Sequence, residues 1–284
     1  EASPLASGWV EKRGEDPNLS AFSKTPAGSS AAGSLDTDPT DRSLDRLMAR
    51  LGLLDDAPPL FGSVSALPRA AVLLAIPALV QSGVFDCARQ VYGSLGPAFY
   101  GLRTTLLTLL LMALWRIKRP EALKEHSPAP LGWVMGIDRA PQVKTLRRKL
   151  ARLALFQRAA QFGQALAQRR IAGHGQAFGF LYVDGHVRVY HGQHRLPKAH
   201  VARMRLSMPA TTDYWVNAMD GQRFFAVTQG VDRGRLSGLR QDSLTRLKRE
   251  LPGQPSAEQL AADSSLSRFT LVCDRAVYAP EFFA

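Results

Sequence analysis

The chain has 284 residues, of which 45% are hydrophobic, and this is enough for one or two domains with buried cores. Its two cysteines, Cys87 and Cys273, exclude a disulfide framework and fit a reducing compartment. The formal net charge is +12, and the stretch from Arg139 to Val183 contains nine Lys and Arg residues and no acid. This basic field favours a polyanionic partner, nucleic acid first, whereas a solvated face that serves solubility is the alternative.

Residues 1–40 are rich in Ser, Gly, Pro, Ala and Asp without a sustained period, which predicts a disordered leader. A helical pattern follows from Ser43 and continues to Arg119. It predicts helices over Ser43–Leu54, Val72–Val80, Val84–Tyr92 and Leu102–Ile117. The two most apolar of these stretches fall short of the ~20 residues that a membrane span needs, so we expect buried helices and no membrane partner.

A basic helical unit is expected near residues 131–154. Leu131–Gly136 reads as a short helix closed by glycine, Ile137–Pro141 as a tight turn, and Gln142–Ala154 as a basic amphipathic helix. This order is typical of a helix-turn-helix. We expect five cations of its second helix to face DNA: Lys144, Arg147, Arg148, Lys149 and Arg152. The alternative is a basic helix that only packs and meets solvent.

Another helix is expected over Leu155–Ile171, and strand signals dominate after Gly173. The strands are expected at Ala177–Asp184, Val187–His191, Tyr214–Asn217, Arg223–Thr228 and Phe269–Cys273. Asp220-Gly221 predicts a hairpin turn, and Asp242–Leu251 predicts a helix before the last strand. The fold class is therefore α+β, with a helical front over 41–172 and a sheet over 173–284.

Two acids about ninety residues apart give this sheet a candidate site. Asp184 ends the first apolar run, and Asp274 directly follows the last one. If the two strands are neighbours, the carboxylates converge, and paired carboxylates suit a hard cation such as Mg²⁺. The alternative for Asp184 is a turn residue, because Asp-Gly is a common hairpin corner.

The histidines after Asp184 raise the question of zinc. Their spacing at His186, His191, His194 and His200 matches no standard zinc signature. We expect a basic surface over DNA instead, made by Arg188, His194, Arg195 and Lys198. The sequence has no phosphate-cradling GxxxxGK[ST] motif and no nucleophile elbow, which argues against nucleotide hydrolysis and serine-type catalysis.

Several segments together resemble a group of DDE-type transposases. They are Gly101–Leu107, Arg116–Glu121, Gly136–Pro141, Tyr182–Gly192, Met208–Val216 and Cys273–Phe283. The resemblance covers roughly residues 60–284 and implies a helical DNA-binding region before a partial RNase H-like catalytic core. The first two family acids fall on Asp184 and Asp274, which would be catalytic and would hold Mg²⁺ or Mn²⁺.

The resemblance also implies where this sequence departs from the family. The third acid, a glutamate on a later helix, has no counterpart, and Ala276-Val277 stand where a glycine-rich continuation is expected. We therefore expect a catalytically incomplete transposase in the cytoplasm, associated with the nucleoid, whose partner is double-stranded DNA at element ends. The sequence leaves open whether the protein forms a homo-oligomer. The alternative function is a non-enzymatic DNA-binding protein that uses the basic helices.

Overall fold

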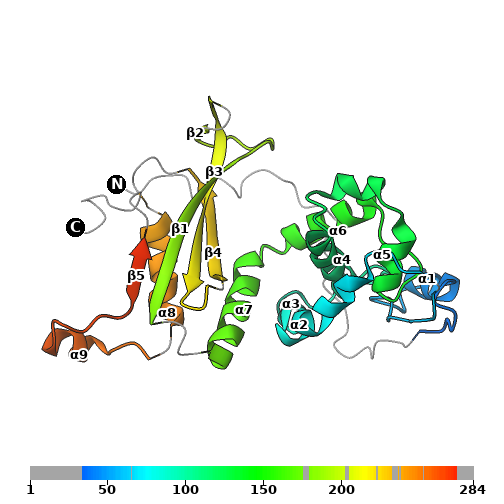
Figure 1. Ribbon diagram of the computed structural model, residues 1–284, viewed down its shortest axis with the longest axis horizontal. Helices are drawn as coiled ribbons and strands as arrows, with labels where there is room; N and C mark the ends of the chain where they lie inside the picture. Colours follow the sequence, from blue (N-terminus) through cyan, green and yellow to red (C-terminus); the bar gives the residue numbers. More distant parts are fainter. Residues whose placement is uncertain are drawn as a thin grey trace.

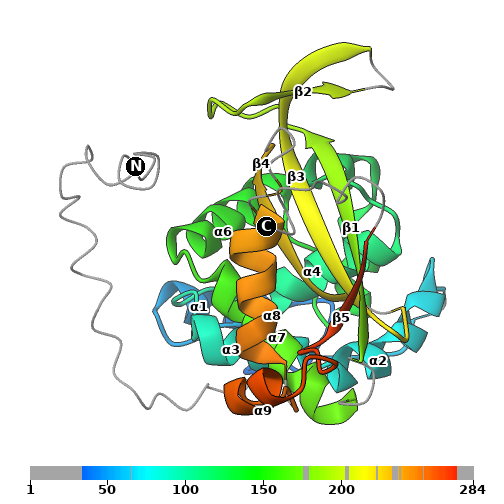
Figure 2. The ribbon, with the colours of Figure 1, turned by 90° about the vertical axis from the view of Figure 1, so that its left-hand side faces the viewer.

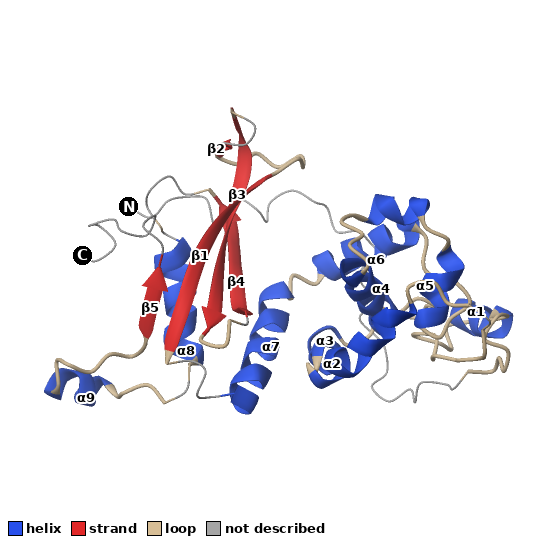
Figure 3. Ribbon diagram, viewed as in Figure 1, coloured by secondary structure: helices blue, strands red, loops and turns tan. Residues whose placement is uncertain are grey.

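The computed structural model describes residues 34–64, 66–174, 179–201, 205–221, 223–231, 236, 238–251 and 253–273. A helical part precedes a mixed sheet, so the expected α+β class is confirmed. Figure 1 shows the two parts at opposite ends of the long axis, with α7 between them, and Figure 3 shows that the described strands lie in the second part.

The helical part follows most of the expected pattern. Its helices are α1 (Ser43–Arg50), α2 (Ile76–Gln81), α3 (Val84–Tyr92), α4 (Leu102–Leu114), α5 (Pro128–Val134), α6 (Val143–Leu155) and α7 (Ala159–His174). Short 3₁₀ helices at Ala70–Ala75 and Pro120–Glu125 precede α2 and α5. The predicted helix at 84–92 matches α3. The helix predicted from Leu155 begins later, because Gln157 has a positive φ of 52° and separates α6 from α7.

The most apolar helix, α4, is the centre of the helical core, as expected. Leu111 is fully buried, and Leu107 and Met112 are nearly so. The buried hydroxyls of Thr105 and Thr108 donate to carbonyl oxygens one turn earlier, at 2.6 and 2.7 Å. This local bonding satisfies polar groups that would otherwise be costly inside the core.

Among the described residues, no single helix has both the length and the apolar character to cross a membrane. The pair Ala70–Gln81 and Val84–Tyr92, bent by 56°, meets the length and composition requirement only when both halves are taken together.

Within the described residues the sheet has five strands: β1 (Phe180–Val189), β2 (Lys198–Val201), β3 (Leu206–Ala218), β4 (Arg223–Gly230) and β5 (Thr270–Cys273). The main order is β4-β3-β1-β5; β1 and β5 are parallel, and the other pairs of these strands are antiparallel. Figures 1 and 2 show β2 and the first part of β3 as a ribbon that projects beyond the sheet. A π-helical turn (Gly238–Ser243), α8 (Leu244–Glu250) and α9 (Ala257–Ala262) connect β4 to β5.

One face of the sheet carries its core. Leu181, Val183 and Val216 point to this inner face and are almost fully buried. They pack with Leu239 of the π-helical turn and Leu247 of α8. Ala167 of α7 belongs to the same cluster. Helix α7 therefore packs on the sheet as well as continuing the helical part, so it joins the two.

The expectation that the first strand ends at Asp184 is wrong, and so is the hairpin-corner alternative. Strand β1 continues through Asp184 and Gly185 to Val189. Both residues pair with β3, Asp184 opposite Trp215 and Gly185 opposite Tyr214. The long partner strand supplies hydrogen bonds past the Asp-Gly step, so this local turn signal is overridden by tertiary pairing.

Three elements were absent from the expectations. These elements are β2, which is short and partly polar, the first half of β3, which contains Pro209, and α9. The sequence signal for α9 is a capping box between Ser256 and Gln259. The expected leader also needs shortening. Residues 1–33 lie outside the described part, whereas Ser34 and Leu35 donate hydrogen bonds to Asp45 in α1, at 2.8 and 3.1 Å.

Replacing Gly132 by Ala in α5 is expected to destabilise the protein by about 1–3 kcal/mol, the usual scale of overpacking. A Cβ at Gly132 would lie 2.4 Å from the Arg139 Cα, and backbone cannot move aside easily. Urea unfolding measures the change. The matched control is Gly173→Ala in α7, where a Cβ meets nothing within 4 Å, and this variant is expected to be neutral or more stable. Equal stability of the two variants would contradict the packing argument.

Candidate active site and nucleic-acid interface

The outer face of the sheet holds the candidate active site. Side chains alternate along a strand, so Asp184 points away from buried Val183 and is exposed. A shallow pocket surrounds it, with β1, β3 and the β3–β4 turn as its walls. Its lining residues are Tyr182, Asp184, His186, Trp215, Asn217, Gly221 and Arg223.

The parallel pairing of β1 with β5 brings the two acid-terminated runs together. The register places Tyr182 opposite Val272 and Val183 opposite Cys273. The two strands are therefore neighbours, which is the condition on which the predicted convergence of the two acids rests. Burial raises the pKa of the Cys273 thiol, which argues against a thiolate nucleophile. Asp274, the second predicted acid, lies outside the described residues.

A second carboxylate lies on the same face and was missed. Asp213 of β3 pairs with His186 of β1, two residues along from the Asp184–Trp215 pair. Its side chain is 3% exposed and forms an ion pair with Arg188, Nη2 to Oδ2 at 2.7 Å, while Oδ1 has no hydrogen-bond partner among the described residues. Arg188, predicted to contact DNA, is thus partly committed to Asp213, with its side chain 60% exposed.

Aromatic and cationic groups border Asp184. The guanidinium of Arg223 stacks over the ring of Trp215 at 4.5 Å, and Tyr182 is 46% exposed beside them. Trp215, Arg223 and Tyr182 were not predicted from the sequence as site residues. The β1–β3 register places Trp215 and Tyr182 on the face of Asp184. The β3–β4 register brings Arg223 opposite Asn217 on that face.

No group of three or more His, Cys, Asp or Glu side chains suited to a metal ion occurs within the part of the chain that the structure describes. The predicted basic residues after β1 lie on the projecting ribbon and its approach. His194, Arg195 and Lys198 are exposed there, and His194 stacks on Tyr190 with ring centroids 6.2 Å apart.

The five predicted cations of α6 divide into two groups. Lys144, Arg147 and Arg148 are not buried, whereas Lys149 is buried and Arg152 is partly buried. Lys149 therefore does not lie on the open surface of α6 as expected, because its position shares the inward side of the helix with Leu146. Arg147 is paired with Glu121, and hydrogen bonding from Arg147 lowers the pKa of that carboxyl group.

The turn between α5 and α6 is braced by α1. Arg46 donates to both carboxylate oxygens of Asp138, at 2.7 and 2.9 Å, and its guanidinium lies 3.8 Å from the centre of the Phe99 ring. Gly136, with φ of 73°, closes α5 as the sequence predicts. The helix–turn–helix order of elements is thus present, and its turn is held by side chains from a distant helix.

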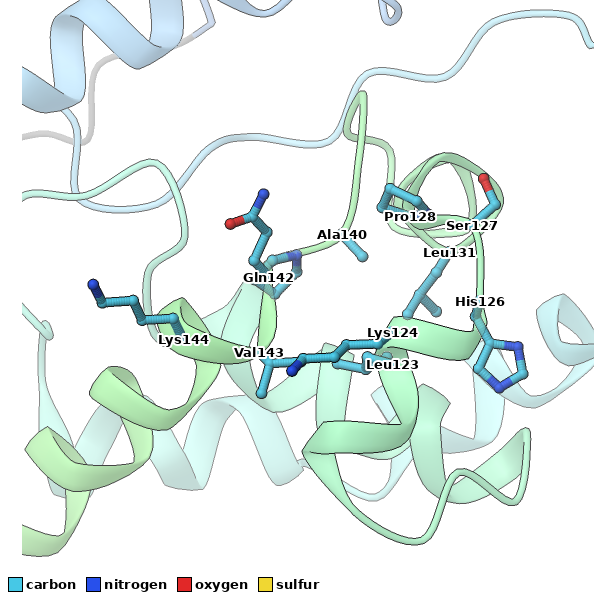
Figure 4. A pocket seen from close by; sticks show the side chains of 11 residues that line it. Leu123, Lys124, His126, Ser127, Pro128, Leu131, Ala140, Gln142, Val143 and Lys144 are labelled. Carbon is cyan, nitrogen blue, oxygen red and sulfur yellow. The ribbon is translucent and has the colours of Figure 1, made fainter.

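A mostly apolar pocket lies beside this turn, between the 3₁₀ helix at Pro120–Glu125 and the start of α6 (Figure 4). Leu123, Leu131 and Val143 give it apolar walls, and Lys124 and Lys144 add positive charge. Its described lining contains no acid.

Comparison with known proteins identifies the class to which these features belong. The family model described as "Transposase protein" matches residues 39–284, a range that includes both the helical part and the sheet. The chain therefore belongs to this family of transposases. No curated protein and no solved structure matches it.

Proposed function

We propose that this transposase is a DDE-type enzyme with an RNase H-like core, in which Asp184 and Asp274 hold Mg²⁺ or Mn²⁺. The observation that carries the proposal is the in-register parallel pairing of β1 with β5. Val183 lies opposite Cys273, and in the sequence the next residue of each segment is an aspartate. The order β4-β3-β1-β5, with α8 between β4 and β5, supports an RNase H-like core.

The residues around Asp184 fit a hard divalent cation. The Asp184 carboxylate is exposed in the outer-face pocket, and the Asn217 amide lines the same pocket. Carboxylate and amide oxygens are ligands that Mg²⁺ and Mn²⁺ accept readily. When bound, such an ion supplies an activated water and stabilises the leaving 3′ oxygen of a DNA strand.

Other residues of the chain would position the DNA. His186 points to the same face as Asp184 and can donate a hydrogen bond to a phosphate oxygen. The stacked Arg223 and Trp215 offer a cation and an aromatic surface next to it. The exposed cations of α6 and of the projecting ribbon would contact backbone phosphates, which fix register without reading sequence.

Metal removal tests the proposal. Double-stranded DNA that carries element ends is incubated with the protein and Mg²⁺ or Mn²⁺, with or without EDTA, and strand cleavage is measured on denaturing gels. Because the sequence predicts a catalytically incomplete enzyme, we expect only weak cleavage, which depends on the metal and stops with EDTA. DNA binding with neither cleavage nor Mn²⁺ binding would favour the non-enzymatic alternative, and cleavage that persists in EDTA would rule out the metal mechanism.

A further inference from the structure

A pocket rich in cations, the basic pocket, lies between α1, the chain segment 95–100 and α6. Helix α1 contributes Arg46 and Arg50, and helix α6 contributes Arg148, Lys149 and Arg152. Among its described lining residues there is no acid, so the pocket concentrates positive charge in a concave surface.

Three of these cations have no carboxylate partner among the described residues. Arg42, Arg46 and Arg50 follow one another at four-residue spacing along α1, so they share one side of it. The first two are used by the fold, because Arg42 pairs with Asp45 and Arg46 with Asp138. By contrast, the side chains of Arg50, Arg148 and Lys149 form no hydrogen bond or ion pair within the described part of the chain.

Lys149 is the cation that most needs an anion. It is 8% exposed, and burial together with the nearby charges of Arg148 and Arg152 lowers its pKa, with Asp56 and Asp55 acting in the opposite direction. A buried ammonium repelled by two guanidinium groups lowers the stability of the folded state. Such an arrangement is expected where the charge serves binding rather than folding.

We propose that the basic pocket is a phosphate-binding site that takes a backbone phosphate of DNA, with Lys149 at its buried side and Arg50 and Arg148 at its exposed side. The inference rests on the DNA binding proposed above and adds a specific anchor point in the helical part. A phosphate oxygen accepts from ammonium and guanidinium groups alike, and a charge-assisted hydrogen bond is strengthened in a partly desolvated pocket. The site is distinct from the Asp184 pocket on the sheet.

The test is Lys149→Met, which removes the charge and keeps most of the apolar side chain. Binding of a labelled duplex is measured by fluorescence anisotropy over a series of KCl concentrations, and thermal unfolding is measured in parallel. We expect weaker binding to every duplex tested, and a salt slope smaller by about 0.9, because one phosphate fewer is neutralised. We also expect an equal or higher melting temperature, because the replaced cation was buried without a partner.

Two further variants control the test. Arg50→Gln, on the exposed side of the pocket, is expected to lower affinity and salt slope in the same way. Lys248→Met removes an equal charge from the exposed surface of α8, outside the pocket, and is expected to leave the salt slope close to that of the unmodified protein. Inorganic phosphate and pyrophosphate serve as probes for a small-anion site.

The possible outcomes separate the pocket from the proposed function. An unchanged salt slope in Lys149→Met, while the unmodified protein binds DNA, would overturn the pocket but not the proposed function. A lower melting temperature alongside weaker binding would assign Lys149 a structural role and overturn the pocket as well. If Lys149→Met abolished pyrophosphate binding but left DNA binding unchanged, the ligand of the pocket would be a small anion, and the proposed DNA phosphate would be overturned. If the unmodified protein bound no DNA, both the basic pocket as a DNA phosphate site and the proposed function would be overturned.

Discussion

Replacing Asp184 by Asn is expected to reduce metal-dependent strand cleavage by at least about 10²–10³-fold, the scale on which one preorganised charge-stabilising group acts. The substitution keeps the size of the side chain and removes its negative charge. Because Asp184 is exposed on the outer face and has no packing role, the fold is expected to be unaffected. DNA affinity is expected to stay the same or rise slightly, since one negative charge is removed near the phosphates.

A second measurement separates metal binding from catalysis. Mn²⁺ binding is followed by the electron paramagnetic resonance signal of the free ion, which requires no cleavage. Removal of an outer hydrogen-bonding partner commonly weakens a metal site about 10–100-fold, so removal of a ligand should weaken it by at least about tenfold. Asp86→Asn is the matched control, because Asp86 is 76% exposed on α3 and 3.8 Å from Arg169 in a weak surface pair. Equal Mn²⁺ affinity in both variants would exclude Asp184 as a ligand.

The parts of the fold that could be predicted were those determined by local pattern. The helix over Val84–Tyr92 was predicted with its bounds, and the apolar run from Leu102 predicted the buried α4. In both segments the identity of the side chains and their helical spacing determine the result, with little dependence on distant residues. The two similar apolar runs, each followed by an aspartate, suggested a pairing of β1 with β5 only as a condition for the site, and their parallel orientation was not predicted.

The missing parts depended on pairing over long distances. Asp184 lies in the middle of β1 rather than at its end, because β3 continues to pair beyond the Asp-Gly step. The same register places Trp215 and buried Asp213 on the face of Asp184, and a shift of one residue would place them on the other face. No local signal determines that register, so the lining of the outer-face pocket could not be derived from sequence alone.

The cations of α6 were also only partly predictable. Their run correctly indicated a basic helix, but its contacts depend on what α1 and segment 95–100 place beside it. Lys149 is turned inward with Leu146, while Arg148 stays exposed one residue earlier. Sequence periodicity could have separated the two, since Lys149 follows Leu146 by three residues and therefore lies near the apolar stripe.

The braces from α1 to the α5–α6 turn were equally invisible in the sequence. Arg42 has a fully buried side chain whose Nη1 donates to the Gly136 carbonyl at 2.9 Å, across a separation of 94 residues. Its Nη2 donates to Pro58 O at 2.7 Å and to the Asp45 carboxylate at 2.5 Å. One side chain thus satisfies two backbone carbonyls and one buried acid.

Replacing Arg42 by Met is therefore expected to lower the free energy of unfolding by about 3–5 kcal/mol, the usual effect of leaving one partner of a buried ion pair alone. Burial opposes the ionisation of Asp45, but hydrogen bonds from Arg42, Ser34 and Leu35 prevail and lower its pKa below the ordinary 3.8. A carboxyl pKa that is lower in the folded state stabilises that state at pH values above the ordinary pKa. This stabilisation disappears as the pH falls through the pKa of the folded state. In Arg42→Met, the decrease in the free energy of unfolding between neutral and acid pH is therefore expected to be smaller. Urea unfolding at neutral and acid pH measures both effects.

The double variant Arg42→Met, Asp45→Leu shows whether the charge or the packing matters more. Replacing both partners of a buried pair by apolar groups is often neutral, so the double variant should recover part of the stability. Recovery is expected to be incomplete, because the Pro58 carbonyl would still lack its donor and the Leu35 amide would be without its acceptor. If Arg42→Met alone left stability unchanged, Arg42 would not be a structural brace. The turn that orients α6, and with it the basic pocket, would then depend on Arg46 and Asp138.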